Sequence, residues 1–381
     1  MALPALTLQD AFATVFEELR ALCPPGAAIV DAHTHLGADE DGQRLTPEAL
    51  LAHLDVVSPD ARACTFPLHD PERRPAYSLP NDRVLAWAAA SGGRIVPYCR
   101  LDPADGPLQE AERCLARGAR GIKLHPRAQA FGFDDPVMDE IFAIARDAGV
   151  PILIHAGRGM PPMDALADVA LRHPEVTLIL AHAAIAGQGM FAERLADHPA
   201  ILYDTSTFST FDLVELFARV PAERVVFASD VPYGRPANGL FAALRVAARA
   251  GLDEDDRRML VGGTMAAVLD GLPLPAPRPP RLPAVRPAEG ALLRAAMYLS
   301  MAFGAALSAG PPADPAMMAP FVEMARCVCR DPAASPAIER IDGMLVSAQQ
   351  LIAAPVAGEA LAAMGLVHAA AVIAATEPVA A

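Results

Sequence analysis

The sequence lacks the features that direct a protein to nucleic acid or into a membrane. Its formal net charge is −14, from 45 acidic and 31 basic side chains, which argues against nucleic acid or an anionic membrane surface as the main partner. The longest apolar stretch, residues 295–310, is too short for a transmembrane helix. The first residues lack the basic region and apolar core of a signal peptide. We therefore expect a soluble protein that acts on a small molecule and binds neither nucleic acid nor a membrane.

Cysteine is scarce and follows no motif. The six cysteines, which show no zinc-finger or redox spacing, are Cys23, Cys64, Cys99, Cys114, Cys327 and Cys329. Scattered cysteines in a chain of 381 residues are typical of reduced core residues, so we expect a cytoplasmic location. A Gly-x-Gly-x-x-Gly motif is also missing after the first predicted strand, which disfavours a doubly wound dinucleotide-binding sheet.

The sequence does contain a regular alternation of strand-like apolar runs with segments of helical periodicity. The predicted strands are 28–33, 62–67, 94–100, 119–125, 150–155, 176–182, 200–205 and 224–230. This alternation, over roughly 240 residues, matches the usual size of a (β/α)₈ barrel. We therefore predict an α/β protein with a TIM barrel over residues 28–271. The N-terminal segment, 1–27, is predicted to contain a helix near 8–22 that packs on the barrel.

The composition changes near residue 272. A proline-rich linker over 272–288 precedes an alanine-rich helical extension over 289–381, with about four helices. The extension shows no cluster of residues suited to catalysis. We expect its apolar faces to pack on the barrel, on each other or on a second subunit, so a homodimer is one expected arrangement.

Residues suited to metal binding stand where the predicted strands end. His33 and His35 lie at i and i+2 in the first strand, so their side chains project to the same side. The residues that end later strands are Lys123 and His125, then His155, His182 and Asp230. In such barrels the chemistry lies at the C-terminal ends of the strands, and imidazole and carboxylate groups bind zinc and similar ions. The pattern predicts a metal site.

The ordered set of motifs resembles the amidohydrolase superfamily, and most closely its amidohydrolase-related branch. The matching segments are Asp31-Ala-His-Thr-His-Leu-Gly, Gly121-Ile-Lys-Leu-His-Pro, Ile154-His-Ala-Gly and Ala228-Ser-Asp-Val-Pro-Tyr-Gly. The resemblance covers roughly residues 28–271 and departs from the usual Gly-Gly-Asn at Gly262-Gly-Thr264. It implies a divalent metal, most simply one Zn²⁺, with these ligands: His33, His35, His155 and Asp230. His182 is then a further ligand or a catalytic histidine.

The resemblance also implies a mechanism. A bound Zn²⁺ makes water acidic enough to ionise near neutral pH, Asp230 accepts the proton, and His182 polarises the substrate carbonyl. The expected reaction is hydrolysis of a C–N or C–O bond in a small, carboxylate-bearing molecule. The alternative is a metal-dependent decarboxylase, because the branch also resembles aminocarboxymuconate-semialdehyde decarboxylase. A third hypothesis is a non-catalytic scaffold that assembles through the extension.

Lys123 has two interpretations. It is either a carboxylated lysine that bridges two metal ions, as in some members of the superfamily, or an ammonium group that binds a substrate carboxylate. The predicted substrate-binding residues are Lys123, His125, Arg100 and Arg158. Weaker candidates for the pocket are His69 and Tyr233, and the histidines expected to be structural are His53, His173 and His198.

Overall fold

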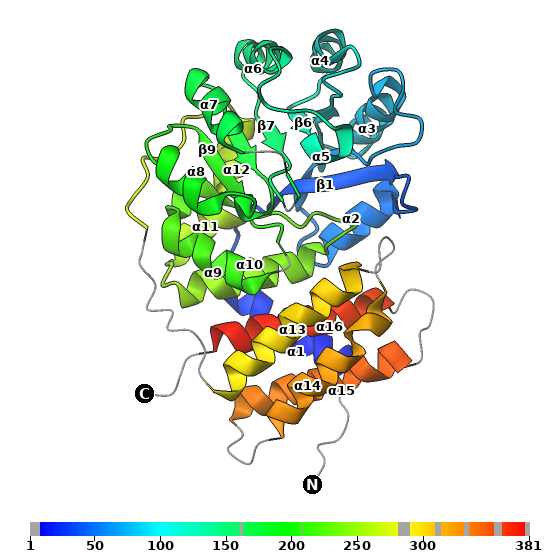
Figure 1. Ribbon diagram of the computed structural model, residues 1–381, viewed down its shortest axis with the longest axis vertical. Coiled ribbons are helices and arrows are strands. Elements are labelled where there is room, and N and C mark those ends of the chain that lie inside the picture. Colours follow the sequence, from blue (N-terminus) through cyan, green and yellow to red (C-terminus); the bar gives the residue numbers. More distant parts are fainter. Residues whose placement is uncertain are drawn as a thin grey trace.

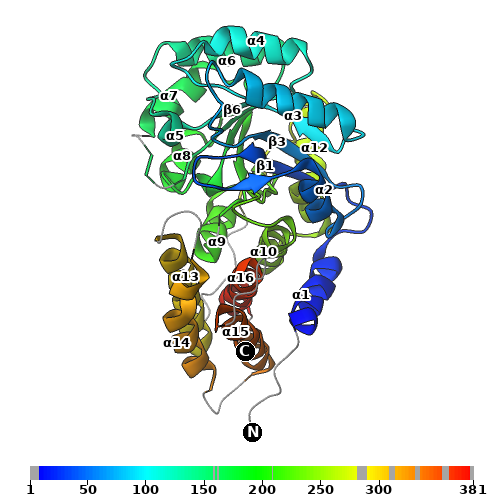
Figure 2. The same cartoon turned by 90° about the vertical axis from the view of Figure 1, so that its right-hand side faces the viewer.

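The computed structural model describes residues 8–157, 159–160, 163–207, 209–280, 290–308, 314–330, 335–353 and 360–377. This part of the chain forms an α/β body and a group of C-terminal helices that lies against one side of the body (Figure 1). Helix α1 (Leu8–Leu22) lies beside the C-terminal helices, although it precedes the body in the sequence (Figure 2).

The body is built on parallel strands that alternate with helices, as the hydrophobic pattern predicts. The parallel strands are β1 (Val30–Ala38), β3 (Arg62–Pro67), β4 (Ile95–Pro97), β5 (Cys99–Arg100), β6 (Ile122–Leu124), β7 (Ile152–Ile154), β8 (Leu178–Leu180), β9 (Ile201–Asp204) and β10 (Val225–Val226). The third predicted strand is divided by Tyr98 into β4 and β5. A short strand that the sequence analysis did not predict, β2 (Arg44–Leu45), pairs antiparallel with the end of β1.

The parallel strands close into a barrel because contacts join the two sheets at both edges. The strand orders are β2-β1-β3-β4 and β10-β9-β8-β7-β6-β5. On one side, Tyr98 between β4 and β5 donates a backbone hydrogen bond to Thr65 of β3 (2.8 Å). On the other side, the amide of Ala32 in β1 donates to Phe227, directly after β10 (2.9 Å). The described residues therefore form a (β/α)₈ barrel, which confirms the predicted fold class.

Helices surround the strands and bury their outer sides. They are α2 (Pro47–Asp55), α3 (Ser78–Ala90), α4 (Pro107–Ala116), α5 (Pro126–Gln129), α6 (Val137–Ala148), α7 (Asp164–Arg172), α8 (Gln188–Arg194), α9 (Thr210–Arg219), α10 (Pro236–Arg249), α11 (Glu254–Arg258) and α12 (Thr264–Leu269). A small core fills the barrel interior with side chains such as Phe66, Leu153 and Ile179. A larger core lies between strands and helices.

The helical extension packs against the outer helix α10. It consists of α13 (Ala291–Ser308), η4 (Pro315–Met318), α14 (Ala319–Cys329), α15 (Pro336–Ala353) and α16 (Ala360–Thr376). Asn238 of α10 donates to the carbonyl of Gly365 in α16 (3.0 Å), and Arg245 donates to Thr376 (2.7 Å). Residues 272–280 form neither helix nor strand, and 281–288 lie outside the described residues. Among the described helices, none has the length and apolar character needed to cross a bilayer.

A glycine lets the end of the barrel approach its first strand. Gly262 lies in η3 (Met259–Gly263), where a Cβ atom would lie 2.8 Å from the backbone nitrogen of Val30 and still closer to the oxygen of Ala28. Both neighbours are backbone atoms next to the start of β1, so neither can move aside as a flexible side chain would. The first glycine of the Gly262-Gly-Thr264 motif is therefore a packing requirement of barrel closure.

We expect Gly262→Ala to lower the free energy of unfolding by about 3 kcal/mol, the upper part of the range for overpacked cores. Urea denaturation followed by circular dichroism measures the change. Gly189→Ala is the matched control, because the nearest atom to a Cβ there is the tip of an arginine side chain, 3.9 Å away. It should not lower stability. Unchanged stability of Gly262→Ala would contradict the packing argument.

Candidate metal centre

A cavity of about 470 Å³ opens at the C-terminal ends of the barrel strands. The predicted site residues that line it are His33, His35, Arg100, Lys123, His125, His155, His182 and Asp230, together with His69 and Tyr233. Arg158, predicted to bind substrate, lies outside the described residues. The barrel therefore brings every described candidate to one cavity, along with residues that were not predicted, such as Asp39 and Arg127.

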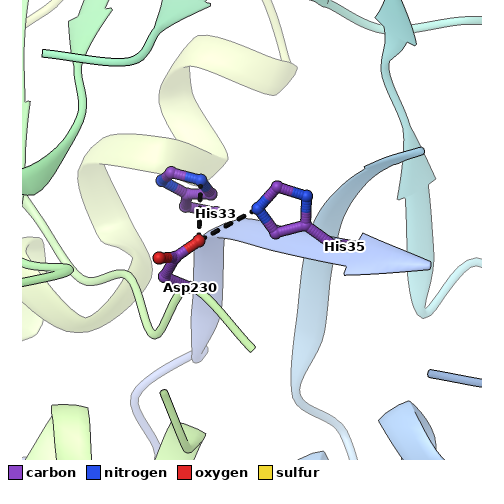
Figure 3. Close-up of side chains that lie close together, drawn as sticks. All are labelled: His33, His35 and Asp230. Atoms are coloured by element: carbon purple, nitrogen blue, oxygen red, sulfur yellow. Dashed lines mark hydrogen bonds and ion pairs between the residues drawn. The ribbon is translucent and has the colours of Figure 1, made fainter. Parts of the chain in front are cut away.

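Three of these side chains form a compact group of donor atoms (Figure 3). One carboxylate oxygen of Asp230, Oδ1, lies 3.1 Å from Nε2 of His33 and 2.9 Å from Nε2 of His35. The three side chains are buried, and their donor atoms lie within 4.8 Å of one another. Within the described ranges, no other group of three His, Cys, Asp or Glu side chains has such spacing. Two imidazole nitrogens and a carboxylate oxygen around one point could hold a divalent ion such as Zn²⁺.

An irregularity in β1 aims the two histidines into the cavity. The pairing register of β1 with β3 shifts between Asp31 and Thr34. Val30, before the shift, and Ala32, within it, face the apolar core of the barrel. The inserted residue changes which side chains point inward, so that His33 and His35 both line the cavity at the end of that core.

Backbone hydrogen bonds hold Asp230 beside these histidines. Asp230 has a φ of +57°, a left-handed conformation that residues other than glycine seldom adopt. Its amide donates to the carbonyl of His33 (2.9 Å), and the amide of Ser229 donates to the carboxylate of Asp31 (3.0 Å). The strained conformation is therefore fixed by the strand that carries the histidines.

Asp204, at the end of β9, orients His33 and was not predicted. Its Oδ2 accepts a hydrogen bond from Nδ1 of His33 (2.8 Å), and its Oδ1 accepts one from the amide of His182 (2.8 Å). Because an ionised carboxylate only accepts, Nδ1 of His33 carries a hydrogen, and Nε2, which faces Asp230, holds either a second proton or a metal ion. Two acceptor atoms 3.1 Å apart need a proton or a metal cation between them. The donor set thus fits a metal ion.

A chain of hydrogen bonds sets the tautomers of two further histidines. Nδ1 of His182 donates to the backbone oxygen of Ser206 (2.8 Å), which leaves Nε2 as an acceptor. Nε2 of His182 lies 2.8 Å from Nδ1 of His155, so the latter is the donor. Nε2 of His155 then carries a lone pair, and this atom is buried with no hydrogen-bond partner among the described residues. A buried, unpaired imidazole nitrogen is suited to a metal ligand.

The surroundings of His155 keep space open beside that nitrogen. A Cβ atom at Gly157 would lie 2.9 Å from Nε2 of His155 and 3.1 Å from the ring of His182. The ring of His125 stacks on His155 with centroids 3.9 Å apart. Nδ1 of His125 accepts from the amide of Ala128 (3.2 Å), which fixes the ring at the start of α5.

Burial and charge set the protonation states of the group. Burial alone would raise the pKa of the Asp230 carboxyl, but the adjacent imidazoles of His33 and His35 hold that pKa well below its ordinary value. Burial lowers the pKa of His35 to about 3 and also lowers the pKa of His155 and of His182. At neutral pH the aspartate is ionised and these three histidines are neutral, which are the forms that coordinate metals.

Two buried basic side chains lie beside the donor group. Lys123 is the only lysine in the chain, and its Nζ lies 3.5 Å from Nε2 of His33. Burial, and then the charge of Arg100, lowers the pKa of Lys123 to about 7, so the amine is partly neutral at neutral pH. Arg100 donates to the carbonyl of Pro67 (3.2 Å) and lies over the ring of Tyr77.

The histidines expected to be structural have partners outside this cavity. His53 lies 3.0 Å from Arg235, and His173 lies 2.8 Å from the carboxylate of Asp139. His198 contacts a backbone oxygen of α7 at 3.1 Å.

A (β/α)₈ barrel with histidines and an aspartate gathered at the ends of its strands defines a class of metal-dependent barrel enzymes. The profile of the amidohydrolase family matches residues 30–271, and the chain belongs to that family. No curated protein matches the sequence significantly.

Solved structures share the fold at low sequence identity. IDCase of Metarhizium anisopliae in its apo form has 14% identity and a TM-score of 0.50, covering 65% of this chain and 98% of its own. A 2,6-dihydroxybenzoate decarboxylase complexed with 2,6-dihydroxybenzoate has 15% identity and a TM-score of 0.50, covering 64% and 99%. A protein described as amidohydrolase II has 15% identity and a TM-score of 0.50, covering 64% and 100%.

We expect the purified protein to hold about one divalent ion per chain, as measured by plasma mass spectrometry. His33→Ala and Asp230→Asn should each remove most of the metal, because each removes one of three clustered donors. His53→Ala is the control, since His53 contacts Arg235 outside the cavity. Full metal content in both His33→Ala and Asp230→Asn would show that the ion binds elsewhere.

Proposed function

We propose that the protein is a metal-dependent hydrolase that cleaves a C–N or C–O bond in a small, carboxylate-bearing molecule. The observation that carries this proposal is the shared oxygen of Asp230 between His33 and His35. It lies in a cavity that also holds the basic side chains of Arg100 and Lys123. The cavity volume of about 470 Å³ suits a small-molecule substrate.

The residues that would hold the metal are His33, His35, Asp230 and His155. Three of them form the donor group, and His155 adds the buried nitrogen that has no partner among the described residues. Imidazole nitrogens with a carboxylate oxygen are typical of zinc sites, so we propose one Zn²⁺. A bound divalent ion supplies Lewis acidity, which makes water acidic enough to lose a proton near neutral pH.

Asp230 is proposed as the general base and acid. Its low pKa keeps it ionised, so it can accept the proton when the oxygen of water attacks the substrate carbonyl carbon. When the C–N or C–O bond breaks, the same proton passes to the leaving nitrogen or oxygen. His182 is proposed to polarise the carbonyl. In the structure its two ring nitrogens contact Ser206 and His155, so this role requires that the ring exchange one of these contacts for an N–H bond to the substrate.

The substrate carboxylate is proposed to bind the basic half of the cavity. Arg100 is buried, and its Nε has no hydrogen-bond partner within the described part of the chain. Lys123 lies next to His33 and changes charge near neutral pH. His125 contributes a neutral ring stacked on His155. A carboxylate placed here pairs with the guanidinium of Arg100 and with the protonated form of Lys123, while its reacting bond lies toward Asp230.

Decarboxylation is the second candidate reaction. The observation that favours it is the 3.5 Å contact of Lys123 with His33, which puts a basic group directly beside the donor group. A substrate carboxylate drawn to that point would itself be the reacting group. The two reactions differ in products, since only decarboxylation releases carbon dioxide.

We expect the zinc-loaded protein to turn over at least one compound in a panel of lactones, amides and aromatic carboxylates. Hydrolysis should place ¹⁸O from labelled water in the product, as read by mass spectrometry, without release of carbon dioxide. His53→Ala should behave like the wild type. Carbon dioxide release without ¹⁸O at the cleaved bond would replace hydrolase by decarboxylase, and a panel with no turnover would favour a non-catalytic scaffold.

We expect one metal ion per site, with Lys123 present as a free amine. Because Lys123 is the only lysine, ¹³C-bicarbonate labelling followed by carbon NMR reports on this single side chain. We expect no lysine carbamate signal, and Lys123→Met should keep its metal. A carbamate signal with two metal ions per chain, both lost in Lys123→Met, would establish the bridged two-metal site instead.

A further inference from the structure

We propose that the helical extension forms one wall of the substrate site. In this arrangement Ser300, Phe303 and Gly304 of α13 limit the size of a second, non-reacting group of the substrate. The proposal rests on the proposed function in one respect, that the substrate carboxylate binds among Arg100 and Lys123. Beyond that function, it specifies which residues contact the opposite end of the substrate.

A second cavity connects the donor group to the extension. It has a volume of about 410 Å³ and shares four lining residues with the first cavity: Arg127, His155, His182 and Asp230. Its far side is lined by Ser300, Phe303 and Gly304 of α13. A molecule held at the donor group therefore has a path that ends on a helix outside the barrel.

Gly304 keeps this path open. It lies in the interior of α13, where glycine costs about 1 kcal/mol relative to alanine. A Cβ atom there would meet nothing within 4 Å, so close packing does not require the glycine. Ser300 lies four residues before Gly304 and three before Phe303, the spacings that place residues on one face of a helix. The missing side chain therefore enlarges the cavity at the point where α13 faces it.

The wall is held in a fixed position. Phe303 is only 5% exposed, and its ring meets the edge of the buried His368 of α16 with centroids 5.5 Å apart. Helix α16 is in turn bonded to the barrel through Asn238 and Gly365. A wall anchored in this way can select substrates by size, because it does not yield to a larger group.

The lining indicates the chemistry of the second group. Ser206, Thr207 and Ser209 provide hydroxyl groups, while Ile185 and Phe303 provide apolar surface. The charged side chains of this cavity carry both signs, with Arg127 against the carboxylates of Asp212 and Asp230, so the lining has no excess of positive charge to hold a second anion. The substrate class is thus a carboxylate with an uncharged, apolar or aromatic group beyond its reacting bond.

Binding of two probes to the zinc-loaded full chain tests the proposal without turnover. The probes are benzoate, which fills the basic half, and biphenyl-4-carboxylate, whose second ring extends toward α13. We expect the wild type to bind biphenyl-4-carboxylate at least tenfold more tightly in calorimetry. Gly304→Leu should abolish that advantage and leave benzoate affinity and metal content unchanged. Ser300→Leu should act in the same way and serves if Gly304→Leu fails to fold.

Met297→Phe is the matched control. Met297 lies two turns earlier on α13, is 51% exposed and does not line the cavity, so added bulk there should change neither affinity. The proposal is overturned if wild type and Gly304→Leu bind biphenyl-4-carboxylate with equal affinity. It is also overturned if Gly304→Leu loses affinity for benzoate and biphenyl-4-carboxylate by the same factor. If benzoate does not bind, the carboxylate site and the proposed function fail. If both probes bind as expected but no compound reacts, the wall stands and the proposed reaction fails.

Discussion

The shared oxygen of Asp230 ties the architecture of the barrel to its chemistry. Asp230 and His35 are 195 positions apart in the sequence. The contacts of Asp230 with His33 and His35 therefore form only when the last strand of the barrel lies beside the first. The same junction is held by the backbone bonds from Ala32 to Phe227 and from Asp230 to His33. Closure of the barrel and assembly of the donor group are therefore a single structural event. Any change that opens this junction separates the donor atoms as well.

The orientation of the donors is fixed before any ion binds. Asp204 sets the tautomer of His33, and Ser206 sets that of His182, which in turn sets that of His155. In each of these histidines, one ring nitrogen is hydrogen-bonded to the partner just named, and this contact sets the direction of the other nitrogen. Such outer contacts stabilise ligand geometry and tune metal affinity. The buried carboxylate of Asp230 needs a cation beside it, and in the absence of a metal the raised pKa of His33 favours a proton at that place. A metal ion that binds here would displace this proton.

The sequence carries enough local information to predict the strands and most of the candidate donors. Apolar runs that end in His155, His182 or Asp230 reveal both a buried strand and a polar group at its end. Asp204 ends a predicted strand in the same way and could have been found by the same rule. The register shift in β1 could not, because alternation along Asp31-Ala-His-Thr-His gives no sign of an extra residue. Nor does spacing reveal that His182 uses both ring nitrogens, since its partners come from other strands.

The extension shows why a sequence alone does not distinguish a helix that only buries apolar surface from one that also contributes to a site. Its alanine-rich helices contain no cluster of ligand residues, and burial of apolar surface is the role that their composition predicts. The family match ends at residue 271, before the first of these helices begins at Ala291. Yet α16 is bonded to α10, and α10 begins six residues after Asp230 in the chain. A layer that packs on α10 is thereby brought to the edge of the candidate site, and α13 follows because it packs on α16. The role proposed for Gly304 follows from its position alone. No packing neighbour requires a glycine there, and the absent side chain leaves space in the cavity.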